Sequence, residues 1–266
     1  MSNNELKELF LKSKNFSFKL ENYFDAYHEN FKEFRNKEIT FVEIGIFQGG
    51  SLEIWKKYFG DKARIIGIDI NPECKKFEDD QIEIFIGDQS DPEFWRNFFQ
   101  KVGDVDIILD DGSHTNLGQI TTTVECVKNL KDGGILFVED VHTSYLKKYN
   151  SSQKLSFINF AKKIIDDVNL NDNLKPNNKF KFSLNSEIYS VNFYSGCVVF
   201  KINRSKTIKN DLIDNEGITH GIEDLTWVTN PINAKNKIFP KLKFLNNIYR
   251  VLNKINVNKH LKKFFN

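Results

Sequence analysis

The 266-residue sequence lacks the features that would point to a membrane, an oxidising compartment or a nucleic acid. Its three cysteines, Cys74, Cys126 and Cys197, form no C-x-x-C pair, so they predict neither a zinc site nor a disulfide framework. No apolar run approaches the roughly 18 residues of a membrane span, and the opening MSNNELKELF is too polar for a signal peptide. The net charge of only +2 does not create the strong positive electrostatic field that would attract a nucleic acid. We predict a cytoplasmic protein that binds no nucleic acid.

What the sequence does have is material for a core, with 40% hydrophobic residues and 25 phenylalanines. Five short β-branched or aliphatic runs alternate with helical stretches: ITFVEIGI, ARIIGIDI, QIEIFIGD, VDIILDDG and GGILFVED. Such alternation predicts a parallel sheet with helices on both faces. EIYSVNFYSGCVVFKI reads as a hairpin that turns at Ser195-Gly196. The expected fold is α/β, a doubly wound, mostly parallel seven-stranded sheet that ends in an antiparallel hairpin.

The flanks of this pattern predict three parts of the chain. Residues 1–37 form an N-terminal helical flank, with one or two amphipathic helices over 5–36. Residues 38–202 form the main domain, in which 145–187 is a substrate-side insertion with a helix over 145–165 and a polar loop over 166–180. Residues 203–266 form an extension whose last part, 235–266, contains no Asp or Glu and predicts a basic amphipathic helix. That helix could contact an anionic membrane, or pack on its own domain or a neighbouring subunit.

Acidic residues end all five runs, and ligands of open parallel sheets bind beyond the carboxyl ends of the strands. In EIGIFQGGS, Gly45, Gly49 and Gly50 let the backbone approach a ligand closely and turn into a helix that begins near Ser51, which is a further donor-side candidate. Glu43 disfavours a pyrophosphate and favours an ammonium or sulfonium. Asp69 is placed to accept from a ribose diol. The expected cofactor is therefore S-adenosylmethionine rather than NAD, and the remaining donor-side candidates are Asp88, beside the adenine, and Asp110.

The fourth and fifth endings predict a metal site. Asp111, Glu139 and Asp140 would bring three carboxylates together, which requires a cation, and oxygen ligands favour Mg²⁺ or Mn²⁺. His114, three residues beyond Asp111, is the candidate general base. His142 and Tyr145 follow the fifth ending and are candidates for the substrate side.

FVEIGIFQGGSLEIWKKYFG, IIGIDI, DDGSH and VEDVHTSY resemble the metal-dependent sugar O-methyltransferases of the mycinamicin and related macrolide pathways, whose relatives include a cephalosporin-pathway protein once called a hydroxylase. The resemblance runs from about Tyr23 to Tyr149 and resumes at IYSVNFYSGCVVF. It implies a class I, Rossmann-like methyltransferase in which Asp111, Glu139 and Asp140 bind Mg²⁺ and His114 is the base. It also implies that the protein forms homo-oligomers.

The function we expect is methyl transfer from S-adenosylmethionine to a sugar hydroxyl, on a free carbohydrate, a nucleotide sugar or a lipid-linked glycan. A composition rich in Asn, Lys, Ile and Phe is typical of AT-rich genomes, and it favours bacterial capsule or lipopolysaccharide sugars over macrolides. Three alternatives stay open. The acceptor could be a natural-product diol or the oxygen of a phosphate or phosphoramidate; the protein could use the same donor and metal for another reaction; or it could be a non-catalytic donor-binding module.

Overall fold

The computed structural model describes residues 5–149, 153–169, 180–207, 213–218 and 220–222, together with six single positions near the carboxyl terminus. The chain divides into two compact units, Met1–Asn210 and Asp211–Asn266. The predicted basic helix at 235–266 lies, apart from those single positions, outside the described residues. No helix in the described part of the chain is long and apolar enough to cross a membrane.

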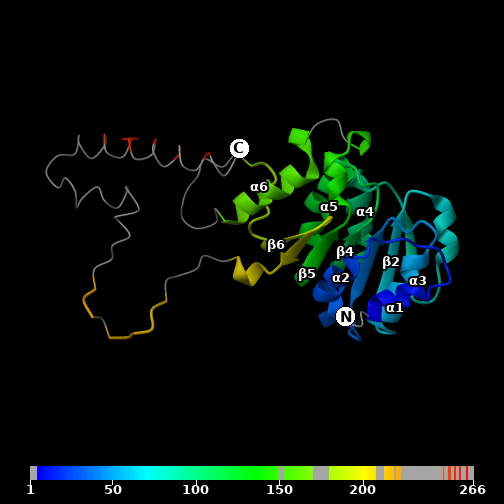
Figure 1. Ribbon diagram of the computed structural model, residues 1–266. Coiled ribbons are helices and arrows are strands. Elements are labelled where there is room, and N and C mark those ends of the chain that lie inside the picture. Colours follow the sequence, from blue (N-terminus) through cyan, green and yellow to red (C-terminus); the bar gives the residue numbers. More distant parts are fainter. Residues whose placement is uncertain are drawn as a thin grey trace. The chain divides into compact units, whose positions relative to one another are not determined.

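A seven-stranded sheet forms the centre of the first unit, in the order β3-β2-β1-β4-β5-β7-β6 (Figure 1). The strands are β1 Thr40–Ile44, β2 Arg64–Asp69, β3 Ile82–Ile86, β4 Val105–Asp110, β5 Leu130–Val138, β6 Ile188–Tyr194 and β7 Cys197–Ile202. The first five pair in parallel, and β7 pairs antiparallel to both β5 and β6. The predicted doubly wound sheet and closing hairpin are confirmed. Strand order reverses between β1 and β4, which places a ligand crevice at that edge.

Helices cover both faces of the sheet. The α-helices are α1 Glu5–Leu11, α2 Tyr23–Phe31, α3 Gly50–Phe59, α4 Pro92–Val102, α5 Asn116–Cys126 and α6 Phe157–Asn169. The short 3-10 helices are η1 Lys32–Phe34, η2 Pro72–Phe77, η3 Val127–Asn129, η4 Val141–Tyr145, η5 Lys147–Tyr149, η6 Gln153–Leu155 and η7 Arg204–Lys206. Neighbouring strand residues alternate between the faces: Phe41 packs with α1, α2 and α3, whereas Val42 packs with α4, α5 and α6.

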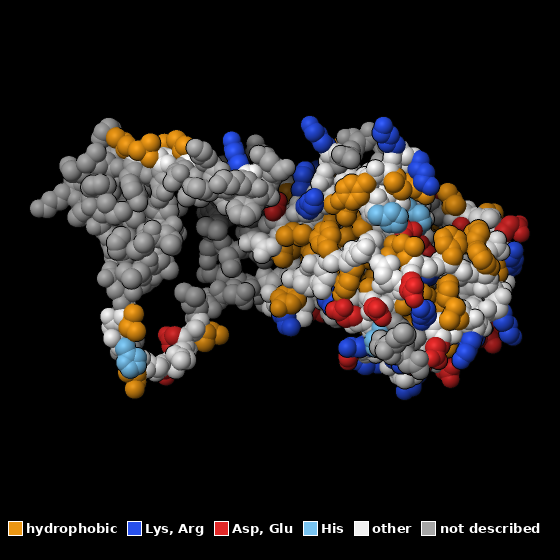
Figure 2. Space-filling view, viewed as in Figure 1, with side chains coloured by type: hydrophobic (Ala, Val, Ile, Leu, Met, Phe, Trp, Pro, Cys, Tyr) orange, Lys and Arg blue, Asp and Glu red, His pale blue; other side chains and the backbone are white. Residues whose placement is uncertain are grey.

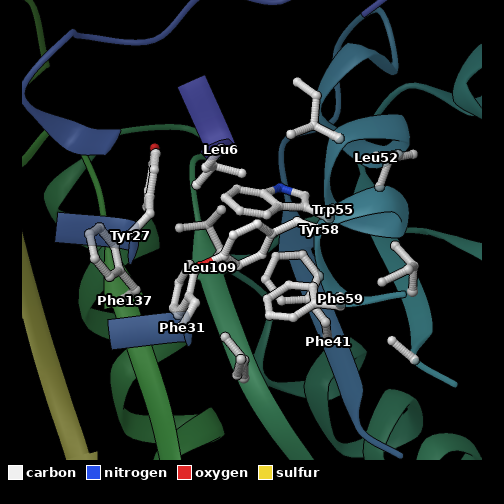
Figure 3. Close-up of a cluster of buried hydrophobic side chains, with 14 of the residues drawn as sticks. Leu6, Tyr27, Phe31, Phe41, Leu52, Trp55, Tyr58, Phe59, Leu109 and Phe137 are labelled. Carbon is white, nitrogen blue, oxygen red and sulfur yellow. The ribbon is translucent and has the colours of Figure 1, made fainter. Parts of the chain in front are cut away.

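The N-terminal helix α2 belongs to the core of this unit. Tyr27 and Phe31 lie between Trp55 of α3 and Phe137 of β5, with ring centroids 5.2–5.7 Å apart (Figure 3). Both side chains are almost completely buried. Because burying an aromatic side chain contributes roughly 2–3 kcal/mol, this packing fixes α2 firmly against the sheet. It also brings polar atoms of α2 to the strand ends.

The helix predicted over 145–165 is present, but its predicted start is wrong. The described residues 141–149 and 153–155 contain short 3-10 helices, and α6 begins only at Phe157. Ser156 caps it by accepting from Asn159 N at 3.2 Å, and Asn116 of α5 accepts from Phe157 N at 2.8 Å. A partly buried contact with α5 therefore sets this boundary. Residues 166–169, predicted as loop, extend α6, and residues 170–179 are outside the described part of the chain.

Candidate active site

A cavity of about 480 Å³ opens at the carboxyl ends of the parallel strands. Its volume lies in the range of small-molecule sites. Six predicted site residues line it: Gly45, Ser51, Asp69, Asp88, Asp111 and His114. The structure therefore brings part of the predicted donor site and part of the predicted metal site onto one cavity. Figure 2 shows one face of the protein, on which histidine side chains lie among hydrophobic ones, with acidic side chains close by.

The glycine turn after β1 is shaped by two close approaches. Gly45 has φ +83°, and a Cβ there would lie 2.2 Å from the backbone oxygen of Asp111. Gly49 has φ +75°, and a Cβ there would lie 2.7 Å from the ring of Phe77. Only glycine fits either position without strain. Gly45 thus allows the ends of β1 and β4 to meet, while Gly49 lies behind the cavity and does not line it.

Two carboxylates predicted to contact the donor lie beneath the cavity instead. Glu43 is fully buried and accepts from Ser51 Oγ at 2.7 Å and from Trp55 Nε1 at 3.1 Å. Burial raises the pKa of Glu43 to about 7 against the opposing charge of Lys19. Asp110 is also buried and accepts from Gln89 Nε2 at 3.0 Å and from Gly112 N at 3.2 Å. Burial raises its pKa to about 6. Both acids hold the turns that form the cavity.

Asp69 and Asp88 remain on the cavity wall. Asp69 Oδ2 accepts from the backbone N–H groups of Ile46 at 3.0 Å and Phe47 at 3.2 Å, and Oδ1 accepts from Asn71 N at 2.9 Å. A carboxylate has about four acceptor sites, so Asp69 can still accept a ligand hydroxyl. Asp88 Oδ1 accepts from Ser90 N at 2.7 Å. Both residues line the cavity, and their contact with a methyl donor stays a prediction.

The metal-side residues form a cluster around His114. Its Nε2 lies 3.5 Å from Asp140 Oδ2 and 3.9 Å from Asp111 Oδ1. One ligand atom from each of these three residues lies within 4.8 Å of the others, the geometry of a possible cation site. Among the described residues no hydrogen-bond partner is found for the buried Nδ1 of His114. The sequence prediction grouped Asp111 and Asp140 with Glu139; the structure groups them with His114.

Glu139 lies beside this cluster but is held by other groups. Lys19, from the segment between α1 and α2, donates to both carboxylate oxygens of Glu139 at 3.2 Å and also to Asp111 Oδ2. Its Nζ lies 3.8 Å from Glu43 Oε1. Burial alone would lower the pKa of Lys19, but the charges of Asp111, Glu139 and Glu43 outweigh burial and raise it. Lys19 is therefore a buried ammonium at the centre of the acids.

Two tyrosines of α2 complete the surroundings of the acids. Tyr27 donates its hydroxyl to Glu139 Oε1 at 2.5 Å, and Tyr23 donates to Asp140 Oδ1 at 2.6 Å. Burial and the charge of Asp111 raise the pKa of Glu139 well above its usual range, although Lys19 and Tyr27 oppose this. Even with one ammonium present, the acids are short of positive charge.

The other two predicted residues lie at the edge of the cluster. His142 Nδ1 is 3.9 Å from Asp140 Oδ1, and about half of its side chain is exposed. Tyr145, at the end of η4, is 60% exposed. Neither lines the cavity. Their assignment to the substrate side stays a prediction.

The backbone is strained at three places around the cavity. Phe47, His114 and Asp140 have positive φ values of 44°, 53° and 52°. Such conformations cost on the order of 1–3 kcal/mol for residues other than glycine. In return, Thr143 donates to the backbone oxygen of His114 at 2.8 Å, which ties the turn after β4 to the turn after β5. This hydrogen bond therefore helps to hold His114 and Asp140 beside each other despite the strain.

A divalent cation fits this donor set. The acids bring carboxylate oxygens, which hard ions such as Mg²⁺ prefer, and they already surround one cation, the Lys19 ammonium. The unpartnered Nδ1 shows that His114 is not consumed by structural hydrogen bonds within the described part of the chain.

Lys19 and the two tyrosine hydroxyls were not anticipated from the sequence. The i, i+4 spacing of Tyr23 and Tyr27 predicted the buried face of a helix, and their hydroxyls were the additional signal that this face meets polar groups. Lys19 carries no comparable signal, because it lies 92 residues from Asp111 and 120 from Glu139 in the sequence.

Comparisons with known proteins agree with the fold and with the motifs. No family model matches the chain. Over 156 residues it is 32% identical to the 8-demethyl-8-α-L-rhamnosyl tetracenomycin-C 2'-O-methyltransferase of Streptomyces olivaceus, covering 55% of this chain and 41% of that protein. It is 30% identical to the demethylmacrocin O-methyltransferase of Streptomyces fradiae, covering 53% and 38%. The matched segment thus spans about two fifths of the length of these relatives.

Among solved structures, the MycE methyltransferase of the mycinamycin pathway, in complex with Mg and SAH, superposes with a TM-score of 0.68 at 24% identity. The match covers 85% of this chain and 58% of MycE. The chain therefore has the class I, Rossmann-like methyltransferase fold. Its homologues are sugar O-methyltransferases of natural-product pathways, as the sequence motifs predicted.

Proposed function

We propose that this protein is an S-adenosylmethionine- and divalent-metal-dependent O-methyltransferase that acts on a sugar hydroxyl. The observation that carries the proposal is the position of Asp111 and His114 on the same cavity as Gly45, Asp69 and Asp88. A group that activates a hydroxyl and a pocket suited to a methyl donor thus share one space. The homology to sugar O-methyltransferases supports the same reading.

Asp111, Asp140 and Glu139 would hold Mg²⁺ or Mn²⁺, while Gly45, Ser51, Asp69 and Asp88 would bind the donor. When bound, the ion would make a sugar hydroxyl more acidic and the donor would supply an electrophilic methyl group. Glu139 would bind the ion only after the hydrogen bonds from Lys19 to its two carboxylate oxygens are broken.

His114 would remove the hydroxyl proton. Its Nε2 faces the acids, and the ring lines the cavity. The Asp140 carboxylate, 3.5 Å away, would offset the positive charge that the imidazole gains. Tyr23 fixes the other oxygen of Asp140, so that this carboxylate cannot rotate away. The strained turn would hold Nε2 on the side of the reacting oxygen.

The finer assignment is a glycan of the bacterial surface, such as capsule or lipopolysaccharide. It is supported by the amino-acid bias of the chain alone, whereas the relatives named above act on sugars of natural products. Surface glycans and glycosylated natural products both offer a sugar hydroxyl as the methyl acceptor.

Methyl transfer from isotope-labelled S-adenosylmethionine tests the proposal directly. The acceptors would be nucleotide sugars, free and lipid-linked glycans, and phosphorylated compounds, each with Mg²⁺, with EDTA, and with Mg²⁺ restored. We expect labelling of a sugar hydroxyl that EDTA abolishes and Mg²⁺ restores. If only phosphorylated acceptors are labelled, the methyl acceptor is a phosphate oxygen rather than a sugar hydroxyl. If the protein binds the donor but transfers no methyl group, it is a non-catalytic binding module.

We further propose that the basic segment 235–266 contacts anionic membranes and that the protein is a homo-oligomer. The absence of acidic residues from this segment supports the first point. Flotation with anionic liposomes should fall when 235–266 is deleted, and unchanged flotation would contradict it. Light scattering of the full chain measures the oligomeric state.

A further inference from the structure

The segment between α1 and α2, residues 12–22, crosses the cavity as an extended chain, and we call it the strap. At one end Ser13 Oγ donates to Gly50 O at 3.1 Å, and Lys14 N donates to Glu53 Oε2 at 3.3 Å. At the other end Asn22 Nδ2 donates to Ser195 O at 2.8 Å. The strap is therefore fixed at both ends by the folded unit.

The middle of the strap is held very differently. The side chains of Phe16 and Phe18 line the cavity and are 63% and 70% exposed, and their rings pack on each other and on Phe47, which is itself 58% exposed. Between Phe18 and Leu20, the Lys19 side chain is only 5% exposed, with its ammonium among the acids. Lys19 thus contributes buried ionic contacts that draw the middle of the strap inward, whereas the aromatic contacts with Phe47 lie at the surface.

With Asp111, Glu139 and Asp140 as its ligands, a divalent ion would need oxygen atoms that Lys19 already contacts. Lys19 occupies both oxygens of Glu139 and Oδ2 of Asp111. Mg²⁺ binds carboxylate oxygens at about 2.0–2.1 Å, so an ion on these atoms would lie against the ammonium. Two cations cannot share that space, because their repulsion in a buried site is strong. Binding of one cation therefore opposes binding of the other.

We propose that Lys19 is an internal cation that holds Asp111 and Glu139 in the metal-free protein, and that a divalent ion displaces it and thereby releases the strap. This inference rests on the proposed metal-dependent function. Phe18, which precedes Lys19, and Ser17 line the cavity, so metal loading also changes the cavity wall. In the metal-free state the ammonium keeps the acids together, and in the loaded state Glu139 is free to bind the ion.

Trypsin tests the release without any variant, because it cleaves after a lysine only when that side chain is available. The full-length protein is digested in EDTA and in saturating Mg²⁺ at equal ionic strength, and the cleavage sites are read by mass spectrometry. We expect cleavage after Lys19 to become about tenfold faster with Mg²⁺. Cleavage after Lys62, an exposed lysine before β2, is the internal reference and should not change. Equal rates after Lys19 in both conditions would overturn the proposal.

Calorimetric titration with Mn²⁺ tests the competition. K19M removes the ammonium, and K14M removes a lysine that lies in the same strap and contacts α3 through its backbone. We expect K19M to bind Mn²⁺ about tenfold more tightly than the wild-type protein and K14M to bind it equally. Weaker or equal binding by K19M would contradict the competition. If no variant binds Mn²⁺, the proposed metal-dependent function fails as well, so the two failures can be told apart.

Discussion

The hydroxyl of Tyr27 in α2 donates a hydrogen bond of 2.5 Å to Glu139, which follows β5, although 112 residues separate the two in the sequence. The ring of the same tyrosine packs between Trp55 and Phe137. One side chain thus joins the aromatic core to the candidate metal site, and the position of the carboxylate depends on the packing of a helix.

Tyr27→Phe should separate these two roles. The ring packing is retained, but the buried Glu139 loses a hydrogen-bond donor, so we expect the free energy of unfolding to fall by about 1–2 kcal/mol. Urea unfolding in EDTA measures this change. Tyr58→Phe is the matched control, since its hydroxyl reaches only His28 Nδ1 at 3.4 Å. An equal loss in both variants would argue against a specific role for the Tyr27 hydroxyl.

His114→Ala should lower turnover on the order of 10²–10⁴-fold while leaving donor binding intact, as expected for a lost general base. The measurements are labelled methyl transfer with the acceptor found in the screen, and calorimetric binding of S-adenosylhomocysteine and Mn²⁺. His28→Ala is the control, because His28 in α2 does not line the cavity and contacts Tyr58 instead. If His114→Ala loses Mn²⁺ affinity as well, His114 is a metal ligand, in line with its grouping with Asp111 and Asp140.

Asp110 should make the folded protein less stable as pH rises from about 4 to 6. Its pKa is raised from an ordinary 3.8 to about 6 by burial, so in this window the folded state holds a proton that the unfolded chain has lost. The free energy of unfolding then falls with rising pH and stays lower above pH 6. Asp110→Asn removes this contribution. Between pH 4 and pH 7, the difference in unfolding free energy between the variant and the wild-type protein should shift in favour of the variant by on the order of 2 kcal/mol. Parallel stability–pH curves for the two proteins would refute the assignment.

Gly45→Ala should lower the free energy of unfolding by more than the addition of a single methyl group usually does. A left-handed backbone costs a residue with a Cβ about 1–2 kcal/mol, and here the Cβ would also lie 2.2 Å from Asp111 O. We expect a larger loss of unfolding free energy than that conformational cost, together with weaker Mn²⁺ binding. Gly103→Ala is the control, since Gly103 has φ +76° and nothing lies within 4 Å of the added Cβ. A similar loss in both variants would show that the contact with Asp111 is unimportant.

The sequence by itself determined the sheet and the edge at which the site lies. The five predicted parallel strands and the hairpin are all present, because runs of β-branched residues buried on both faces have few other stable arrangements. Parallel strands end at one edge, so residues at or just after those ends, such as Asp69, Asp111 and Asp140, lie along that edge. The start of α6 was missed, because a contact with Asn116 of α5 sets it rather than a local signal.

Only the tertiary structure decided how charge is distributed at that edge. The sequence places Glu43 and Asp110 at the ends of strands, but the depth of the packing buries them beneath the cavity. Lys19 and Tyr27 reach Glu139 because the aromatic face of α2 packs against the sheet and brings the preceding strap with it. Periodicity in a sequence specifies which face of an element is buried. It does not specify which distant polar atoms that burial brings together, because those contacts depend on how whole elements pack.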